Sequence, residues 1–380
     1  MTCLQDTDFA AVKAAVARGE SLPAAWYTRD DVSALEMSCI LERHWQYIGA
    51  TTQLARDGDF ITGVIGRVPV VVIRDGERLN GYVNVCRHRR HPVMQGAGNA
   101  CRMRCPYHAW TYDLAGKLIG LPRANELPPH ARADLGLLPV RVETLGPFVF
   151  AHLQQDAEPL ASVYPTAMAE LARAGIDLAR LVPVGTQHWR LKGNWKNALE
   201  NYLECYHCAV AHPEFAASVD VGRNAYALSA AGYELRQTSS DRKGSSPRQD
   251  EAAVHHACPA DDATTRTPER IDQFHFLYPN LTINSSAGTS NLSIDVWRPD
   301  GASHTAGCST HFFDPAADPA FVEQVIALDK LVAEQDVGLV ASVQEALRGA
   351  WPQKTCLLPD SERLVIHFQG LIVDSLAAAA

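Results

Sequence analysis

Two short pairs of cysteine and histidine constrain this chain more than any other feature. Cys86 is followed two residues later by His88, and after sixteen intervening residues Cys105 is followed three residues later by His108. β-Branched segments precede the first pair, so we expect the pairs on two loops of a small β domain. Thiolates suit a cluster iron that stays ferric, and imidazoles on the second iron remove negative charge and raise the reduction potential. The pairs therefore predict a [2Fe–2S] cluster with these four ligands.

A structural zinc ion is the alternative interpretation of the same four residues. Two cysteines and two histidines also satisfy a tetrahedral ion. Zinc sites, however, usually space their histidines more widely, as His-x3–5-His on a helix. Here each loop supplies one cysteine and one histidine, and this arrangement favours the iron–sulfur cluster.

A second group of metal-ligand residues lies in the second half of the chain. Residues 194–207 have a helical pattern and lead to His212 and Pro213. On an undistorted helix, His207 and His212 would point about 140° apart. We expect the helix to end or distort between them, because a residue before proline avoids the α region. Two histidines and one carboxylate form the facial triad of non-haem Fe(II) oxygenases, with positions left open for oxygen and substrate. A pair of hydrogen-bonded core histidines is the alternative.

The third ligand is expected on a long helix from about Ala320 to Leu347. Asp336 lies on an apolar stripe of this helix, and metal coordination is one of few ways to relieve a buried carboxylate. Asp329 shares the face, so the pattern favours Asp336 without excluding Asp329. The stripe consists of Val332, Val340, Val343 and Leu347.

The remaining patterns predict an α+β protein rather than regular βαβ alternation. Residues 8–49 are expected to be helical, and Asp75-Gly76 supplies a hairpin turn. Residues 238–270 are polar and predict a loop, in which His255 and His256 are solvated. Further helices are expected at 167–174 and 197–211. Strands are expected at 60–65, 68–74, 79–85, 140–144, 148–153, 274–277, 281–284 and 292–297.

Charge and cysteine usage narrow the functional classes. The 34 basic and 43 acidic residues give a net charge of −9, which disfavours nucleic acid or an anionic membrane as the main partner. No apolar run approaches the ~18 residues of a membrane span, and without an export signal at the amino terminus we expect a cytoplasmic protein. The ten cysteines argue against a disulfide scaffold, and we expect Cys205 and Cys208 to be small packing residues.

Both constellations resemble one known family. Cys86-Arg87-His88-Arg89 and Cys105-Pro106-Tyr107-His108-Ala109-Trp110 resemble the cluster motif of Rieske ring-hydroxylating and demethylating oxygenase α subunits. The segments Glu204-Cys205-Tyr206-His207, His212-Pro213 and Gln335-Asp336 resemble the mononuclear-iron segments of the same subunits. In that family the aspartate that corresponds to Asp336 is the third iron ligand. The motif departs at Arg90, where the family commonly has glycine.

The resemblance covers roughly Trp26 to Leu376 and implies a domain plan. An antiparallel β Rieske domain is inserted in a helix-grip catalytic domain, commonly assembled as a head-to-tail homotrimer. We expect residues 1–45 to be the helical start of the catalytic domain, 46–155 the Rieske domain and 156–380 the rest of the catalytic domain.

The resemblance also implies a path for electrons between subunits. In the family, a carboxylate joins a cluster histidine of one subunit to an iron histidine of the next. Glu204 occupies that position, with a neighbour's His108 and its own His207 as expected partners, and Asn201 is assigned with it to the catalytic group. Most relatives have aspartate there, and the longer glutamate resembles the branch that oxidises quaternary ammonium compounds.

These expectations define a terminal oxygenase that uses O2 to hydroxylate or N-demethylate a small betaine-, carnitine- or choline-like compound. The chain has no dinucleotide-binding glycine motif, so electrons from NAD(P)H must arrive through a separate flavin/iron–sulfur reductase. The alternatives are a hydroxylase or demethylase of an aromatic acid and, outside enzymes, an iron–sulfur or zinc protein that transfers electrons or binds a partner.

The expected pocket holds a permanent cation against aromatic faces, because ring quadrupoles attract a cation that cannot donate hydrogen bonds. Core packing is the alternative for any one of these aromatic residues. They are Tyr202, Tyr206, Phe274, Phe276, Tyr278 and Trp297.

Overall fold

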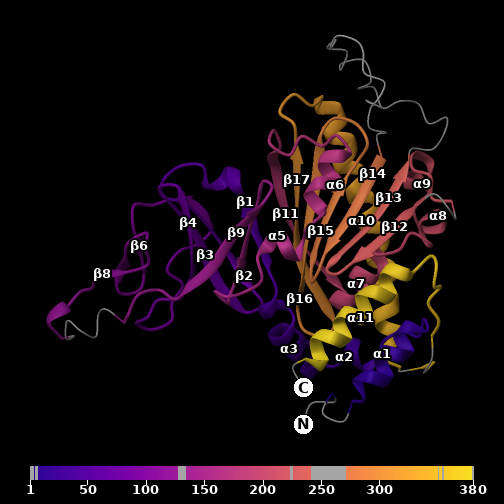
Figure 1. Cartoon of the computed structure of the whole chain (residues 1–380), viewed down its shortest axis with the longest axis horizontal. Helices are drawn as coiled ribbons and strands as arrows, with labels where there is room; N and C mark the ends of the chain where they lie inside the picture. The colour runs from indigo at the N-terminus through magenta and orange to yellow at the C-terminus, as the bar shows by residue number, and fades with distance from the viewer. Residues whose placement is uncertain are drawn as a thin grey trace. The chain divides into compact units, whose positions relative to one another are not determined.

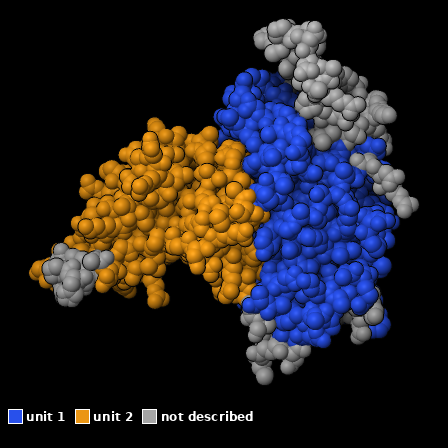
Figure 2. Space-filling view, viewed as in Figure 1, with its two compact units in different colours: residues 1–36, 164–380 blue, residues 37–163 orange. Residues whose placement is uncertain are grey.

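The computed structural model describes residue 4 and residues 7–126, 134–222, 226–240, 271–349, 351–352 and 355–378. The chain divides into two compact units (Figure 2). The larger unit consists of residues 1–36 and 164–380, and the smaller unit consists of residues 37–163. The smaller unit is therefore continuous in sequence and interrupts the larger one. Among the described helices, none is both long and apolar enough to cross a bilayer.

The larger unit is built on a seven-stranded antiparallel sheet in the order β11-β17-β16-β15-β14-β13-β12. Figure 1 shows the long helix α10 (Pro319–Leu347) running across this sheet. Asp318 caps the amino end of α10, because its side chain accepts a hydrogen bond from the backbone N–H of Ala320. Pro319 occupies the first turn, where proline is favoured. The strands are β11 Val182–Lys192, β12 Ala227–Ala231, β13 Glu234–Ser240, β14 Ile271–Leu277, β15 Leu281–Ser285, β16 Asn291–Pro299 and β17 His304–Phe313.

Shorter helices complete the larger unit. A buried ion pair fixes α7 (Trp195–Tyr202) to the amino-terminal helices, because Lys196 Nζ lies 2.6 Å from Glu36 Oε1 and both side chains are fully buried. Such a pair is costly to break, since the remaining charge would be buried alone. The other helices are α1 Phe9–Ala17, α2 Ala25–Thr28, α3 Asp30–Cys39, α6 Ala167–Arg173, α8 Cys208–Ala211, α9 Pro213–Ser218 and α11 Arg363–Ala377.

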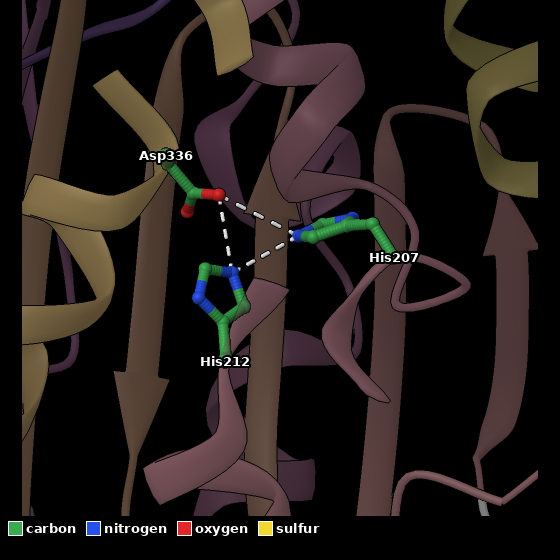
Figure 3. Close-up of side chains that lie close together, drawn as sticks. All are labelled: His207, His212 and Asp336. Carbon is green, nitrogen blue, oxygen red and sulfur yellow. Dashed lines mark hydrogen bonds and ion pairs between the residues drawn. The ribbon is translucent and has the colours of Figure 1, made fainter. Parts of the chain in front are cut away.

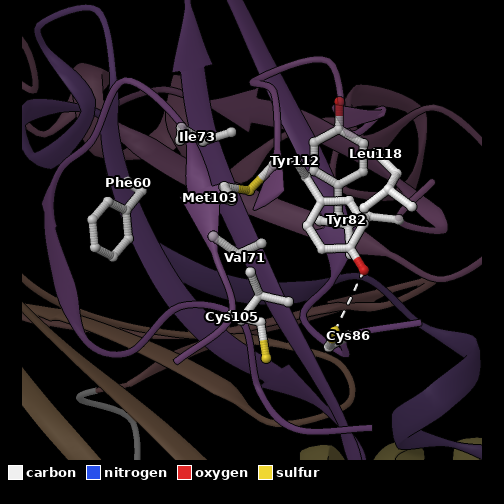
Figure 4. Packing of buried hydrophobic residues seen from close by; sticks show 11 residues of the cluster. Phe60, Val71, Ile73, Tyr82, Cys86, Met103, Cys105, Tyr112 and Leu118 are labelled. Atoms are coloured by element: carbon white, nitrogen blue, oxygen red, sulfur yellow. Dashed lines mark hydrogen bonds between the residues drawn. The ribbon is translucent and has the colours of Figure 1, made fainter. Parts of the chain in front are cut away.

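The smaller unit contains a seven-stranded sheet in the order β1-β10-β9-β4-β3-β2-β5 and a three-stranded sheet β6-β7-β8. Cys86 and Cys105 lie in a buried cluster with Val71, Met103 and Tyr112 (Figure 4). The strands are β1 Gln46–Ala50, β2 Asp59–Ile65, β3 Val68–Asp75, β4 Arg78–Val83, β5 Ala97–Asn99, β6 Met103–Arg104, β7 Thr111–Tyr112, β8 Leu118–Gly120, β9 Pro139–Leu145 and β10 Phe148–His152. Its short helices are η1 Leu41–Arg43, η2 Thr51–Leu54, η3 Ala124–Glu126 and α5 Leu160–Val163.

The structure corrects two of the expected helices. Residues 8–49 are not helical throughout, because β1 begins at Gln46 and pairs with β10, which packs Tyr47 against Phe148 and Phe150. The helix expected at 197–211 is interrupted between Tyr202 and Cys208. Of the loop expected at 238–270, residues 238–240 belong to β13, and residues 241–270, with the His255-His256 pair, lie outside the described residues.

The apolar stripe expected on α10 is also partly wrong. Val340 is buried, but Val343 is 50% exposed. The buried positions of the helix are Phe321, Val325, Val340 and Gln344, which follow one another at multiples of about one helical turn.

Candidate metal centres and cavity

The two cysteine–histidine pairs lie on loops with matching backbone geometry. The backbone N–H of Arg90 donates to Cys86 O at 3.0 Å, and that of Ala109 donates to Cys105 O at the same distance. Arg90 and Ala109 both adopt a left-handed conformation, with φ of 61° and 56°. Each loop thus folds back on its own cysteine four residues after it. The left-handed turn explains why glycine suits position 90 in related motifs.

The four side chains of these loops fit a two-iron cluster. Cys86 and Cys105 are buried, and the rings of His88 and His108 lie 4.5 Å apart between centroids. The Nδ1 atom of His108 is buried without a hydrogen-bond partner. A buried imidazole nitrogen is costly unless it is bonded, and metal coordination would satisfy it.

The geometry disfavours one zinc ion at this site. In a tetrahedral zinc site all ligand atoms lie within about 4 Å of one another. Among the described residues, the only group of three potential ligands within 4.8 Å of one another is His207, His212 and Asp336. The four loop residues therefore do not converge on one ion, whereas a cluster with two irons spreads its ligands.

Electrostatics of the loops agree with a bound cation. Burial raises the pKa of the Cys105 thiol, and the neighbouring Cys86 adds to the rise. Two thiolates at this place therefore need positive charge beside them. Burial, His88 and Arg89 lower the pKa of His108, so this ring is held in the neutral form that a metal requires.

The second metal-ligand group forms where α7 ends. The break after Tyr202 carries His207, and His212 ends α8 with a non-helical backbone directly before Pro213. This break turns both imidazoles toward α10 (Figure 3). The Nε2 atoms of His207 and His212 lie 3.1 Å apart, and Asp336 Oδ1 lies 3.5 Å from the first and 3.1 Å from the second. Three donor atoms thus surround one point, as a single metal ion requires.

Charges around this group would attract a metal ion. Burial disfavours a charge on Asp336, but hydrogen bonds with His207 and His212 hold the pKa of this carboxyl at about 2. Burial also opposes a charge on His207, yet Asp336 and Glu204 raise its pKa to about 9. The carboxylates therefore favour positive charge at this point, and a metal ion would replace the imidazole protons.

Neighbouring polar groups orient the three residues. His212 Nδ1 lies 2.7 Å from Gln335 Oε1, and Gln335 Nε2 donates to Glu214 Oε2 at 3.1 Å. Asn201 donates its side-chain amide to Asp336 Oδ1 at 3.2 Å. Such outer contacts fix the ring tautomer and leave Nε2 free for a metal.

Glu204 contacts the same group from the other side. Its carboxylate accepts the backbone N–H of His207 at 3.2 Å and interacts with Nδ1 of the same residue. The structure thus places Glu204 against His207, which is one of the two partners that the family resemblance implies for it. Asp329, the competing carboxylate, lies elsewhere on α10, with Oδ2 at 3.1 Å from His311 Nε2.

A cavity of about 400 Å³ adjoins His207, His212 and Asp336, between the sheet and the helices α7 and α10. Tyr202, Phe274 and Trp297 line it as expected. The sequence did not single out several further aromatic and acidic residues of this lining, because only the folded chain brings them together from the sheet, α9 and the segment before β12. These include Trp189, Phe215, Tyr226, Asp272 and Asp295.

Three expected pocket residues lie elsewhere. Phe276 is fully buried in the core, where it packs on Phe368 of α11. It points to the same face of β14 as Phe274 but lies two residues further along the strand. Tyr278 is buried beside the same phenylalanine. Tyr206 is 66% exposed, since α7 ends before it and the chain turns its ring outward.

Cys205 and Cys208 correct a further expectation. They were expected to be small packing residues, but the structure joins them in a disulfide across the break between α7 and α8. Both residues line the cavity. The bond closes a short loop that contains Tyr206 and His207, so it constrains the backbone that carries one of the imidazoles.

Comparison with known proteins places this arrangement in context. Carnitine monooxygenase oxygenase subunit from Escherichia coli (strain K12) is 32% identical over 205 residues, which are 53% of this chain and 55% of that protein. The match thus spans about half the length of that relative. Chloroplastic choline monooxygenase from Arabidopsis thaliana is 26% identical over 352 residues, covering 87% of this chain and 77% of that protein.

A solved structure shares the fold along almost the whole chain. The quaternary ammonium Rieske monooxygenase CntA, crystallised with an inhibitor, superimposes with a TM-score of 0.81 at 24% identity. The superposition covers 96% of this chain and 97% of CntA. The fold of this chain therefore combines a Rieske domain with an α+β catalytic domain, as in CntA.

Family models match both parts of the chain. The Rieske [2Fe-2S] domain matches residues 44–131, the region of the two matching loops. The catalytic domain of the ring-hydroxylating alpha subunit matches residues 178–378, where His207, His212 and Asp336 meet. Because this second match extends over more than half of the 380 residues, the chain belongs to the ring-hydroxylating α-subunit family of Rieske non-haem iron oxygenases.

Proposed function

We propose that this protein is a terminal oxygenase that hydroxylates or N-demethylates a small quaternary ammonium compound of the betaine, carnitine or choline type. The observation that carries the proposal is the cluster of His207, His212 and Asp336 at the wall of an aromatic and acidic cavity. In this proposal the three residues hold Fe(II), and Cys86, His88, Cys105 and His108 hold the [2Fe–2S] cluster. When bound, these groups supply dioxygen activation and electron storage.

The charges of the cavity favour a cationic substrate over an aromatic acid. Among the described residues that line the cavity, the lysine and arginine residues are Lys330 and Arg190, and each already pairs with an acidic side chain. Arg190 Nε lies 2.5 Å from Asp300, and Lys330 Nζ lies 3.8 Å from Glu334. Both basic side chains are more than half exposed, so they can meet a carboxylate tail at the open side but not deep in the cavity.

The relatives support the same substrate class. Proteins named for carnitine and choline oxidation match the chain, and a third match is named the glycine betaine monooxygenase oxygenase subunit of Chromohalobacter salexigens. Attack at an N-methyl group places one oxygen atom of O2 in an N-hydroxymethyl group and releases the other as water, with two electrons and two protons consumed. The N-hydroxymethyl group then breaks its C–N bond to give formaldehyde, a tertiary amine and a proton.

Electron supply involves partners in this proposal. A separate reductase passes electrons from NAD(P)H to the cluster. A homotrimer brings a neighbour's His108 to Glu204, which already contacts His207. The contact of Glu204 with one histidine supports this route. The proposal also includes a cytoplasmic location.

Oxygen uptake by the loaded enzyme with a surrogate reductase tests the function. Betaine, carnitine and choline are compared with benzoate and its methoxy derivatives as aromatic acids. We expect a quaternary ammonium compound to accelerate oxygen uptake and, where demethylation occurs, to give formaldehyde in step with it. Acceleration by an aromatic acid alone would establish the alternative function. The Asp336→Ala variant is the control for uptake that does not depend on the iron site.

A further inference from the structure

We infer that Asp295, which is linked through Ser309 and Thr282 to Trp189 and Trp297, is the subsite for the cationic head of the substrate. This inference rests on the proposed function and assigns residues to its specificity. Asp295 and both tryptophans line the cavity, and two of these three residues were not singled out by the sequence. Their contacts link four neighbouring strands of the sheet, β11, β17, β16 and β15.

The two tryptophans form a rigid corner. Trp189 of β11 and Trp297 of β16 have ring centroids 4.8 Å apart and ring planes at 60°. Trp189 Nε1 donates to Ser309 Oγ at 2.8 Å, and Trp297 Nε1 donates to Thr282 Oγ1 at 3.1 Å. Because both indole N–H groups are satisfied within the sheet, the rings present apolar, electron-rich surface to the cavity.

Both hydroxyls pass their own hydrogen on to Asp295. Ser309 Oγ donates to Oδ1, and Thr282 Oγ1 donates to Oδ2 at 3.2 Å. Asn284 Nδ2 donates to Oδ2 at 3.2 Å. A carboxyl group that only accepts hydrogen bonds is stabilised in its ionised form. Through the two hydroxyl groups, one carboxylate therefore fixes the edges of both rings, and its negative charge lies at the corner.

This charge is not neutralised by a lysine or arginine among the described residues. In the described part of the chain, no lysine or arginine forms an ion pair with Asp295. His311 lies in the same cavity, but it pairs with Asp329. Burial and the nearby Asp329 raise the pKa of Asp295, whereas the hydrogen bond from Ser309 and the nearby His311 oppose that rise. A buried carboxylate in this position gains most from a cation supplied from outside.

The geometry selects a quaternary ammonium over a primary one. A trimethylammonium group is attracted by the indole faces and by the carboxylate without needing any acceptor. A primary ammonium brings three N–H donors. Both oxygens of Asp295 already accept hydrogen bonds, and the indole faces offer no strong acceptor, so a primary ammonium would lose hydration without full compensation.

Binding measurements on the loaded enzyme test this assignment. Titration calorimetry compares choline with 3,3-dimethylbutan-1-ol, its neutral isostere, and with ethanolamine. In the unmodified protein we expect choline to bind roughly tenfold or more tightly than either compound. The Asp295→Asn variant, which keeps the shape and removes the charge, should bring the ratio of choline to the neutral isostere close to one. The Asp374→Asn variant removes an exposed carboxylate of α11 and should keep the ratio.

A second variant keeps the test decisive if Asp295→Asn does not fold. Trp189→Leu removes one ring face and should weaken choline more than the neutral isostere, while retention of the mononuclear iron reports folding of the larger unit. An unchanged ratio in either folded variant, in a protein that oxidises choline-type compounds, overturns the subsite assignment alone. If the unmodified protein neither binds nor oxidises any quaternary ammonium compound, the proposed function itself is wrong.

Discussion

Asp336 Oδ1 lies 3.1 Å from His212 Nε2, so a carboxylate of α10 reaches the imidazole that ends α8. Asp329 is on the same helix but faces His311 instead. We therefore expect Asp336→Ala to lose the mononuclear iron and abolish turnover while the cluster spectrum persists. Asp329→Ala is the matched control and should keep its iron. Metal analysis of both anaerobically purified variants checks the assignment, and equal iron contents would contradict it.

The cluster loops lead to a separate prediction about metal content. The unmodified protein should contain about three irons and two acid-labile sulfides per chain, one iron belonging to the mononuclear site. Cys105→Ser should lose both sulfides and the visible absorption. Cys101→Ser changes an exposed cysteine close by and should retain them. Stoichiometric zinc in a colourless unmodified protein would refute the iron–sulfur assignment.

Glu204 should matter for electron delivery rather than for metal binding. Its carboxylate contacts Nδ1 and the backbone N–H of His207, and the proposed route continues to a neighbouring subunit. Glu204→Gln should keep both metal contents and slow reoxidation of the reduced cluster roughly a hundredfold. Stopped-flow absorption during a single turnover measures this rate. Glu323→Gln, at an exposed position of α10, should reoxidise normally, and a normal rate in Glu204→Gln would rule out the bridge.

His275 should make the catalytic unit sensitive to acid. Burial, helped by Arg236, lowers the pKa of this imidazole to about 3, against about 6.5 in an unfolded chain. Between these values the unfolded chain binds the extra proton, so stability falls as the pH falls from about 6.5 to 3, by up to about 1.4 kcal/mol per pH unit.

Replacement of His275 by a residue that does not titrate isolates this effect. His275→Gln keeps a side chain able to donate to Gln273, the present partner of Nε2 at 2.6 Å. Denaturant unfolding of both proteins at pH 7 and pH 5 gives the comparison. The loss of stability on acidification should be smaller in the variant, and equal losses would show that another group is responsible.

Position 90 offers a test of backbone strain in the cluster loop. A left-handed φ such as the 61° of Arg90 costs a non-glycine residue about 1–2 kcal/mol. Glycine removes this cost but lowers the stability by about 0.4–1 kcal/mol, because it gives the unfolded chain more freedom. Arg90→Gly should therefore stabilise the cluster domain by up to about 1.6 kcal/mol. The denaturant midpoint for loss of cluster absorption measures it. Arg102→Gly, at an exposed position without a left-handed backbone, should be neutral or destabilising.

Local patterns predicted the features that depend on neighbouring residues. The cysteine–histidine spacing indicated the two cluster loops, and Pro213 indicated the break that brings His207 and His212 together. The periodicity of residues 320–347 predicted α10, whose observed span is Pro319–Leu347.

Features that depend on distant pairing could not be predicted. Strand β11 is mostly exposed and lacks an alternating apolar pattern, and only its ladder with β17 defines it. Asp295 gave no signal, because its role depends on which face of β16 is turned toward the cavity. Tyr206 was misplaced for a related reason, since the end of α7 reverses the direction that a continued helix would give its ring.

Adjacent residues of α10 hold opposite edges of one imidazole. Gln335 meets Nδ1 of His212, and Asp336 approaches Nε2 of the same ring. A rotation or shift of α10 must therefore carry the imidazole and the carboxylate together. The centre consequently consists of two parts instead of three, one held by α10 and one on the loop of His207. Any motion that opens the site has to change the separation between these two parts.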